Sequence, residues 1–118
     1  LEATASSMFA YVLLKGSRLG YFGDDLKQAG IKAYQGTLKE FVKVNVDKTI
    51  SLTQCCEVSG LGPGPGPYVK KPNYRRDGSF EYYISEPIRD NDGKGVGPFI
   101  WASLEMEKLG YNVSSLTY

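Results

Sequence analysis

The sequence contains no histidine, and this absence removes the side chain that proteins use most often as a general base and as a metal ligand. Cysteine is almost absent too, with two residues that are neighbours, Cys55 and Cys56. Adjacent residues of a strand point to opposite faces, so these thiols are poorly placed to bond each other. Two thiols without histidine do not make a zinc site either, and we interpret them as ordinary thiols.

Long runs of one charge are also missing. Lys and Arg together number 14 and Asp and Glu number 13, a balance that argues against non-specific binding of nucleic acid. The apolar run from Ala3 to Leu14 is too short to span a bilayer, and Glu2 stands where a signal peptide would be positive. The sequence therefore predicts neither a nucleic-acid partner nor a membrane partner.

The chain of 118 residues opens directly in an apolar helix, without a start methionine. Natural chains seldom begin inside a buried helix. We therefore expect residues 1–118 to form a single segment of a larger protein, cut on its N-terminal side.

Three helical patterns are present. Ala3 to Leu19 and Val96 to Leu109 are almost free of charge, which predicts helices that are buried nearly all round, with Pro98 in the first turn of the second one. Asp24 to Val44 has one apolar stripe and a face rich in lysine, which predicts an amphipathic surface helix. The alternation of buried and half-buried helices predicts two concentric layers, with the inner helices parallel and starting at one rim.

A long connection joins the second and third helical patterns. Residues Thr49 to Val58 alternate and are rich in β-branched side chains, which predicts a strand, and Asp77 to Pro87 is predicted as its antiparallel partner. The Gly- and Pro-rich stretch from Gly60 to Arg76 is predicted as an irregular loop. Because long loops in compact domains are usually functional, we expect a site at the rim where this connection ends.

No motif of catalysis or metal binding is complete. The stretch "DNDGKG" has Trp101 where a calcium loop needs glutamate, and Gly95 follows Lys94 where a phosphate loop needs Ser or Thr. The aspartates and glutamates show no spacing that singles out a catalytic pair. The sequence therefore predicts no catalytic residue, metal site or cofactor in this chain.

The expected site is one for an anionic sugar. Lys94 precedes a helix start, where its charge and the amides of Val96, Gly97 and Phe99 would attract an anion. The expected substrate-binding residues are Lys94, Gly95, Glu2, Ser6, Ser7 and Tyr83. Two alternatives stay open: Lys94 as a solvated turn residue, and Tyr83 as a packing residue rather than a platform for a sugar ring.

Three stretches, "LEATASSMFAYVLLKGSRLGY", "TISLTQCCEVSGLG" and "GSFEYYISEPIRDNDGKGVGPFIWASLEMEKL", cover most of the chain. In that order they resemble the C-terminal third of unsaturated rhamnogalacturonyl hydrolases, glycoside hydrolase family 105, which is related to family 88. The resemblance implies a mainly α chain, the C-terminal fragment of an (α/α)6 barrel with a small antiparallel two-stranded element.

The resemblance also implies a reaction in pectin degradation. Such bacterial enzymes act on oligosaccharides that end in an unsaturated uronic acid, hydrate its vinyl ether without a metal, and free the sugar as the hemiketal collapses. The catalytic aspartates of the family lie upstream of the matched part, so this chain alone is expected to be inactive. Its expected partner is the missing N-terminal part of the barrel, or a second copy through self-association.

Two readings without catalysis stay open, a carbohydrate-binding module and a protein-interaction module. The sequence leaves the compartment open between the cytoplasm and the periplasm of a bacterium.

Overall fold

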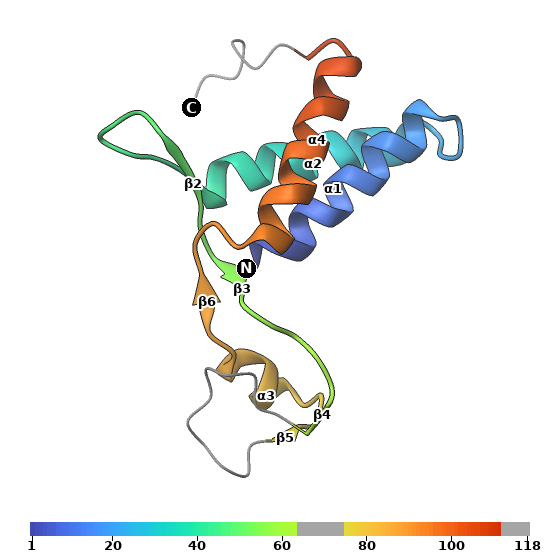
Figure 1. Ribbon diagram of the computed structural model, residues 1–118. Coiled ribbons are helices and arrows are strands. Elements are labelled where there is room, and N and C mark those ends of the chain that lie inside the picture. Colours follow the sequence, from blue (N-terminus) through green and yellow to red (C-terminus); the bar gives the residue numbers. More distant parts are fainter. Residues whose placement is uncertain (64–74, 112–118) are drawn as a thin grey trace.

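The computed structural model describes residues 1–63 and 75–111 as a body of three long helices from which short strand pairs extend (Figure 1). The helices are α1 (Ala3–Arg18), α2 (Asp24–Phe41), α3 (Phe80–Ser85) and α4 (Gly93–Lys108). The strands are β1 (Val42–Val44), β2 (Ile50–Leu52), β3 (Cys55–Cys56), β4 (Gly62–Pro63), β5 (Arg75–Arg76) and β6 (Ile88–Arg89). The predicted Gly- and Pro-rich loop lies mostly outside the described residues, as does the tail after Tyr111.

The core lies where α1, α2 and α4 meet. Tyr34 of α2 stacks on Phe99 of α4, with ring centroids 6.0 Å apart, and its hydroxyl donates to Ser103 Oγ at 2.9 Å. The remaining core is apolar: Ala3, Ala10, Leu14, Ile31, Leu38, Phe41, Leu52, Cys55, Ala102 and Met106. The charged face of α2 lies in solvent, which confirms the amphipathic outer helix.

Helices α1 and α4 begin at the same end of the body, as the layer argument predicts (Figure 1). Ala3, the first residue of α1, donates its amide to the carbonyl of Gln54 at 3.0 Å, and Thr4 lies beside Gly95 of α4. At the opposite end the Arg18 guanidinium binds Glu105 of α4, with 2.5 Å between Nε and Oε2. The two helices therefore run parallel, each against α2.

Two predicted helix boundaries were wrong. Helix α2 ends at Phe41, because Val42 and Val44 belong to β1, which pairs antiparallel with β2. Helix α4 begins at Gly93 rather than Val96, because the Asp92 side chain accepts from the amide of Lys94 and caps the helix there. Pro98 consequently lies in the second turn, where it offers no N–H to the carbonyl of Lys94.

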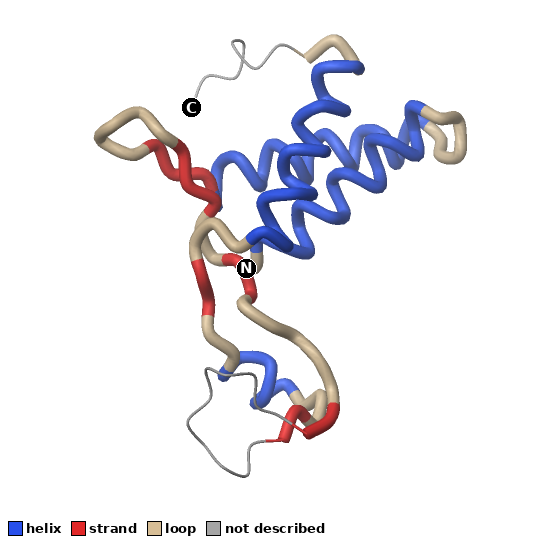
Figure 2. The backbone as a smooth tube through the Cα atoms, in the orientation of Figure 1, coloured by secondary structure: helices blue, strands red, loops and turns tan. Residues whose placement is uncertain are grey.

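The prediction of short antiparallel strands was correct, but the predicted positions of the strands were only partly correct. The region from Thr49 to Val58 holds two short strands, β2 and β3, separated at Gln54, whose φ is 59°. These strands do not pair with each other: β2 pairs with β1, and β3 pairs with β6 (Figure 2). A third antiparallel pair joins β4 and β5.

The predicted strand over 77–87 is wrong, because this stretch forms the short helix α3. The Ser79 side chain accepts from the amide of Tyr82 at 3.0 Å and caps the helix. Its aromatic residues favour strands in general, but here the local cap and the burial of Tyr82 decide the conformation.

Within this chain alone α1 and α4 are not covered on every side, although the sequence predicts them as buried helices of a larger protein. Each helix buries one face against its neighbours and leaves large apolar side chains in solvent on the other. Phe9 is 68% exposed on α1, and Trp101 is 54% exposed on α4 although its ring lies 5.4 Å from that of Tyr11. The core of this chain therefore does not explain why these two helix faces carry no charged residues.

Candidate functional site: the rim where two helices begin

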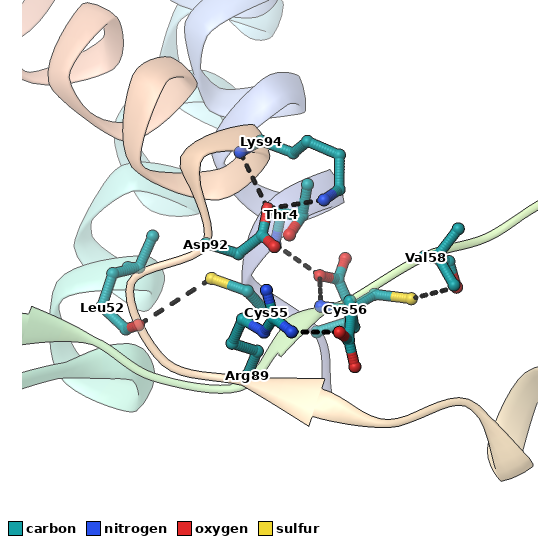
Figure 3. Close-up of polar contacts among 10 residues, drawn as sticks. Thr4, Leu52, Cys55, Cys56, Val58, Arg89, Asp92 and Lys94 are labelled. Carbon is teal, nitrogen blue, oxygen red and sulfur yellow. Dashed lines mark hydrogen bonds and ion pairs between the residues drawn. The ribbon is translucent and has the colours of Figure 1, made fainter. Parts of the chain in front are cut away.

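The starts of α1 and α4 lie against the strand pair β3–β6, and we call the polar residues gathered there the rim (Figure 3). Its members are Glu2, Thr4, Cys56, Glu57, Arg89, Asp92 and Lys94. They come from four segments of the chain, which the antiparallel register Cys55↔Arg89 and Cys56↔Ile88 brings together.

Glu2 accepts hydrogen bonds from the backbone of two segments at once. Its Oε1 accepts from the amides of Thr4 at 2.6 Å and Cys56 at 2.9 Å, and its Oε2 accepts from the amide of Ala5 at 2.7 Å. Burial alone would raise the pKa of Glu2, but these backbone hydrogen bonds outweigh it and lower the pKa. Glu2 therefore stays ionised and joins α1 to β3, so most of its acceptor capacity is already used.

Lys94 is paired with its neighbour Asp92. The ammonium Nζ lies 2.8 Å from Asp92 Oδ1, and the Lys94 amide donates to the same oxygen at 2.9 Å (Figure 3). The hydrogen bond from the Lys94 side chain, followed by that from its amide, lowers the pKa of the buried Asp92. The side chain of Lys94 is 55% exposed, so its ammonium faces solvent as well as Asp92.

The amides expected to attract an anion are not free. Gly95 and Val96 both donate their N–H to the carbonyl of Asp92 at 2.9 Å, and Gly97 and Phe99 lie inside α4. Gly95 is buried, and a Cβ at this position would lie 2.7 Å from Cys55 Sγ. The structure thus gives Gly95 a packing role and contradicts a backbone anion cradle at Val96, Gly97 and Phe99.

The predicted serines and tyrosine lie at different depths. Ser6 donates its hydroxyl to the carbonyl of Glu2 at 2.6 Å, whereas Ser7 is 0% exposed among the helices and does not reach the surface. Tyr83 of α3 is exposed on one side. Partial burial is the main cause that raises the pKa of Tyr83, and the negative charge of Glu2 adds to it.

The remaining charges of the rim are paired. Arg89 of β6 forms an ion pair with Glu57, across the strand pair (Figure 3). Cys55 and Cys56 are both free thiols, as predicted, and burial is the main cause that raises the pKa of each. The thiols are therefore protonated at neutral pH and do not add charge.

Asp92 is the residue that sequence reasoning missed. The spacing of the acidic residues did not distinguish it, yet it both caps α4 and holds Lys94. A signal was present in the sequence, because aspartate is a preferred N-cap residue and Asp92 directly precedes the residues of α4. Placing the cap at Asp92 would also have given the correct start of α4.

Within residues 1–63 and 75–111, no group of three or more acidic, cysteine or histidine side chains is arranged to hold a metal ion. In the same ranges, every helix is too short or too polar to cross a bilayer.

Comparison with known proteins agrees with this architecture. Residues 1–110 match the family model described as Glycosyl Hydrolase Family 88. Two curated proteins, Protein Atu3128 of Agrobacterium fabrum and the 24.9 kDa protein in the picA locus of Rhizobium radiobacter, are each 38% identical over 108 residues. These alignments cover 88% of this chain and 43% of each relative.

A solved glycoside hydrolase of family 105 from C. acetobutylicum ATCC 824 is similar in sequence and in structure. It has 49% identity and a TM-score of 0.78 over 92% of this chain, which corresponds to 28% of its own length. The chain thus spans less than half the length of the proteins that it matches. The likeness confirms the expected fold class, a mainly α chain with the helix arrangement of an (α/α)6 barrel.

The family match extends over nearly all described residues, including both inner helices and the rim between them. The chain therefore belongs to glycosyl hydrolase family 88.

Proposed function

We propose that this chain is part of a glycoside hydrolase that removes the unsaturated terminal uronic acid from pectin-derived oligosaccharides, the rhamnogalacturonan fragments left by lyases. The enzyme hydrates the vinyl ether of that residue, and the hemiketal formed then collapses and releases the shortened oligosaccharide. The observation that carries the proposal is the 49% identity to a family 105 glycoside hydrolase over 92% of this chain.

The proposal places the catalytic aspartates in the part of the polypeptide that this chain does not contain. The role of this chain is then to bind substrate at the rim. Lys94 is the residue best suited to this role, because an ammonium has three N–H donors and one of them reaches Asp92. The other two can bind the carboxylate of a uronic acid, a charge-assisted contact stronger than one between neutral groups.

The other expected residues contribute in smaller ways. Tyr83 of α3 is partly exposed, which suits stacking on a sugar ring. Ser6 already donates within α1, and Glu2 already accepts from the backbone of α1 and β3, so they can share hydrogen bonds with sugar hydroxyls but chiefly shape the rim. Gly95 acts by bringing α4 close to β3, and Ser7 by packing inside the body.

The full-length protein tests the proposal directly. Incubated with an oligosaccharide that ends in an unsaturated uronic acid, it should abolish the ultraviolet absorbance of the conjugated double bond and release the shortened oligosaccharide in equal amount. The matched control is the same oligosaccharide with a saturated terminal residue, which has no vinyl ether to hydrate.

Cleavage of both substrates would point to ordinary hydrolysis at the anomeric carbon and contradict the proposal. Binding of the oligosaccharide without cleavage would instead support a carbohydrate-binding module.

A further inference from the structure

The part of the chain between β3 and β6, which we call the excursion, holds a pocket of its own. Its described residues contain β4, β5 and α3, which lie apart from the three long helices (Figure 1). The pocket has a volume of about 320 Å³. Its lining residues are Ser59, Gly60, Leu61, Gly78, Tyr82 and Tyr83. The rim is therefore a separate place, since it shares none of these described residues.

The walls of this pocket are held together by contacts between distant residues. The hydroxyl of the buried Tyr82 accepts from the amide of Gly60 at 3.2 Å, which joins α3 to the segment before β4. Gly78 has a φ of 78°, and a Cβ there would lie 2.8 Å from Leu61 Cδ2. Glycine at this position thus lets Leu61 stay against the opposite wall.

An ion pair lies beside the wall at Gly60. Arg76 Nε is 3.6 Å from Glu86 Oε1, and the two side chains are only 16% and 1% exposed. A Cβ at Gly60 would lie 3.7 Å from Arg76 Nη1, so the guanidinium is a near neighbour of a lining residue. Arg76 Nε has no hydrogen-bond partner among the described residues. Because a buried ion pair is weak evidence for stability, its place beside a pocket points to recognition of a ligand.

We propose that the excursion pocket binds one neutral sugar ring, which stacks on Tyr83 and accepts a hydrogen bond from Arg76. Tyr83 is 45% exposed, and its flat apolar ring suits the C–H face of a pyranose. Glu86 compensates the charge of Arg76, so the pocket offers N–H donors without net charge. This arrangement favours sugar hydroxyls over a carboxylate.

The size and the other groups of the pocket agree with this ligand. Ligand pockets have volumes of about 300–1,000 Å³, and this one lies at the small end of that range, which suits a single ring. The hydroxyl of Ser59 and the exposed backbone of Gly78 are further partners for sugar hydroxyls.

The pocket deepens the proposed function by adding a second place for the same oligosaccharide. Rhamnogalacturonan alternates a uronic acid with the neutral sugar rhamnose, so rhamnose is the expected occupant. The choice of rhamnose rests on the proposed function, whereas the neutral class of sugar rests on the residues of the pocket.

Saturation-transfer NMR of the full-length protein with methyl α-rhamnopyranoside tests the proposal. We expect transfer to the ring protons of the sugar. Tyr83→Ala should weaken binding roughly twofold to tenfold, because the stacking face is lost. Tyr21→Ala is the matched control: this tyrosine is 77% exposed in the turn between α1 and α2, and its loss should leave the affinity unchanged.

A second variant blocks the pocket without changing Tyr83. Ser59→Trp would place a large side chain among the lining residues and should abolish binding of the rhamnoside. Gln35→Trp, on the solvent face of α2, is its control and should bind as the unsubstituted protein does. Both positions are exposed, so melting temperatures should stay close to that of the unsubstituted protein.

Absence of saturation transfer, or equal affinity in the unsubstituted protein, Tyr83→Ala and Ser59→Trp, would overturn the proposal. It would also be overturned if the two variants lost binding of methyl galacturonide but kept that of the rhamnoside, because the pocket would then take an acidic sugar. The test requires no cleavage. Pocket-dependent binding of the rhamnoside by a protein that does not hydrate the vinyl ether would support the pocket and reject the proposed function.

Discussion

At the scale of single residues, Asp92 and Lys94 show how a helix cap and an ion pair share one atom. Asp92 Oδ1 receives both the amide and the ammonium of Lys94, at 2.9 and 2.8 Å. The carboxylate thereby keeps the ammonium at the rim, where the long side chain would otherwise sample many rotamers. In its proposed role Lys94 would then be positioned for a substrate before one arrives, with its charge partly compensated by Asp92.

Replacing Lys94 tests its contact with substrate. In the full-length enzyme Lys94→Met should raise the Michaelis constant for an unsaturated uronide tenfold to hundredfold, because a charge-assisted hydrogen bond contributes roughly 1.5–3 kcal/mol. Steady-state kinetics measure the effect, and Lys32→Met on the solvent face of α2 is the control that should leave the constant unchanged. An unchanged constant for Lys94→Met, with the fold intact, would make Lys94 a turn residue.

Gly95 offers a second test at this scale. Gly95→Ala would place a Cβ 2.7 Å from Cys55 Sγ, 3.1 Å from Thr4 Oγ1 and 3.3 Å from Leu52 Cδ2. We expect the free energy of unfolding of the full-length protein to fall by ~1–3 kcal/mol from this overpacking. Denaturant unfolding measures it, with Gly93→Ala as the control, because a Cβ at Gly93 has no neighbour within 4 Å. Equal stability of the two variants would show that the side chains around Gly95 can move aside at little cost.

At the scale of elements, the sequence predicted the long helices well and the connection poorly. Periodicity over many residues located α1 to within one residue of its end, and the polar face of α2 marked it as an outer helix. The short elements depend instead on single contacts, such as the cap that Ser79 provides for α3. A pattern of aromatic residues does not show whether such a cap forms, so α3 was predicted as a strand.

The site was less predictable than the fold for a similar reason. The rim and Lys94 followed from the expectation that α1 and α4 begin together, which the structure confirms. The hydrogen bonds that occupy Glu2 and the amides of Gly95 and Val96 depend on atomic placement. Residue spacing alone does not determine them.

Glu105 makes the junction of α1 and α4 sensitive to pH. The Arg18 hydrogen bond is the main cause that lowers the pKa of this buried carboxyl, and Lys108 binds the same group at 3.0 Å. A carboxyl with a lowered pKa contributes stability above its unfolded value near 4.5 and loses that contribution as the pH falls through its folded value. We therefore expect the full-length protein to lose stability as the pH falls below 4.5, in part because Glu105 becomes protonated.

The free energy of unfolding, measured against pH, should fall in this range for the unsubstituted protein. It should fall less steeply for Glu105→Gln. Glu107→Gln, at an exposed position of α4, is the matched control and should follow the unsubstituted curve. Identical slopes in all three proteins would mean that the Glu105 contact does not form in solution.

At the scale of the whole molecule, the chain is thin for its length, with extents of 51 × 39 × 18 Å. Its smallest dimension is less than two helix diameters, which are about 10–12 Å each. Few side chains can be enclosed by such a layer, so α1 and α4 keep apolar faces in solvent. Soluble monomers rarely expose contiguous apolar surface of this kind.

The isolated chain should therefore behave as an incomplete unit. We expect residues 1–118 alone to be mainly helical by circular dichroism, to bind an apolar dye, to self-associate in sedimentation and to lack activity on unsaturated uronides. A stable monomer that binds no dye would contradict the expectation that this chain is an incomplete unit. A spectrum dominated by β-structure would contradict the fold itself.

The pairing of β3 with β6 has a consequence for how this family can diversify. The chain leaves the helical body at Cys56 and returns at Ile88, and the Glu57 amide donates to the Pro87 carbonyl at 3.0 Å, so both ends of the excursion are fastened together. Insertions or deletions between them need not disturb the helices, and each doubling of loop length costs only about 0.6 kcal/mol. Evolution can therefore lengthen or shorten the excursion beside the rim while the helices stay the same, and under the proposed function such changes would alter which oligosaccharides fit.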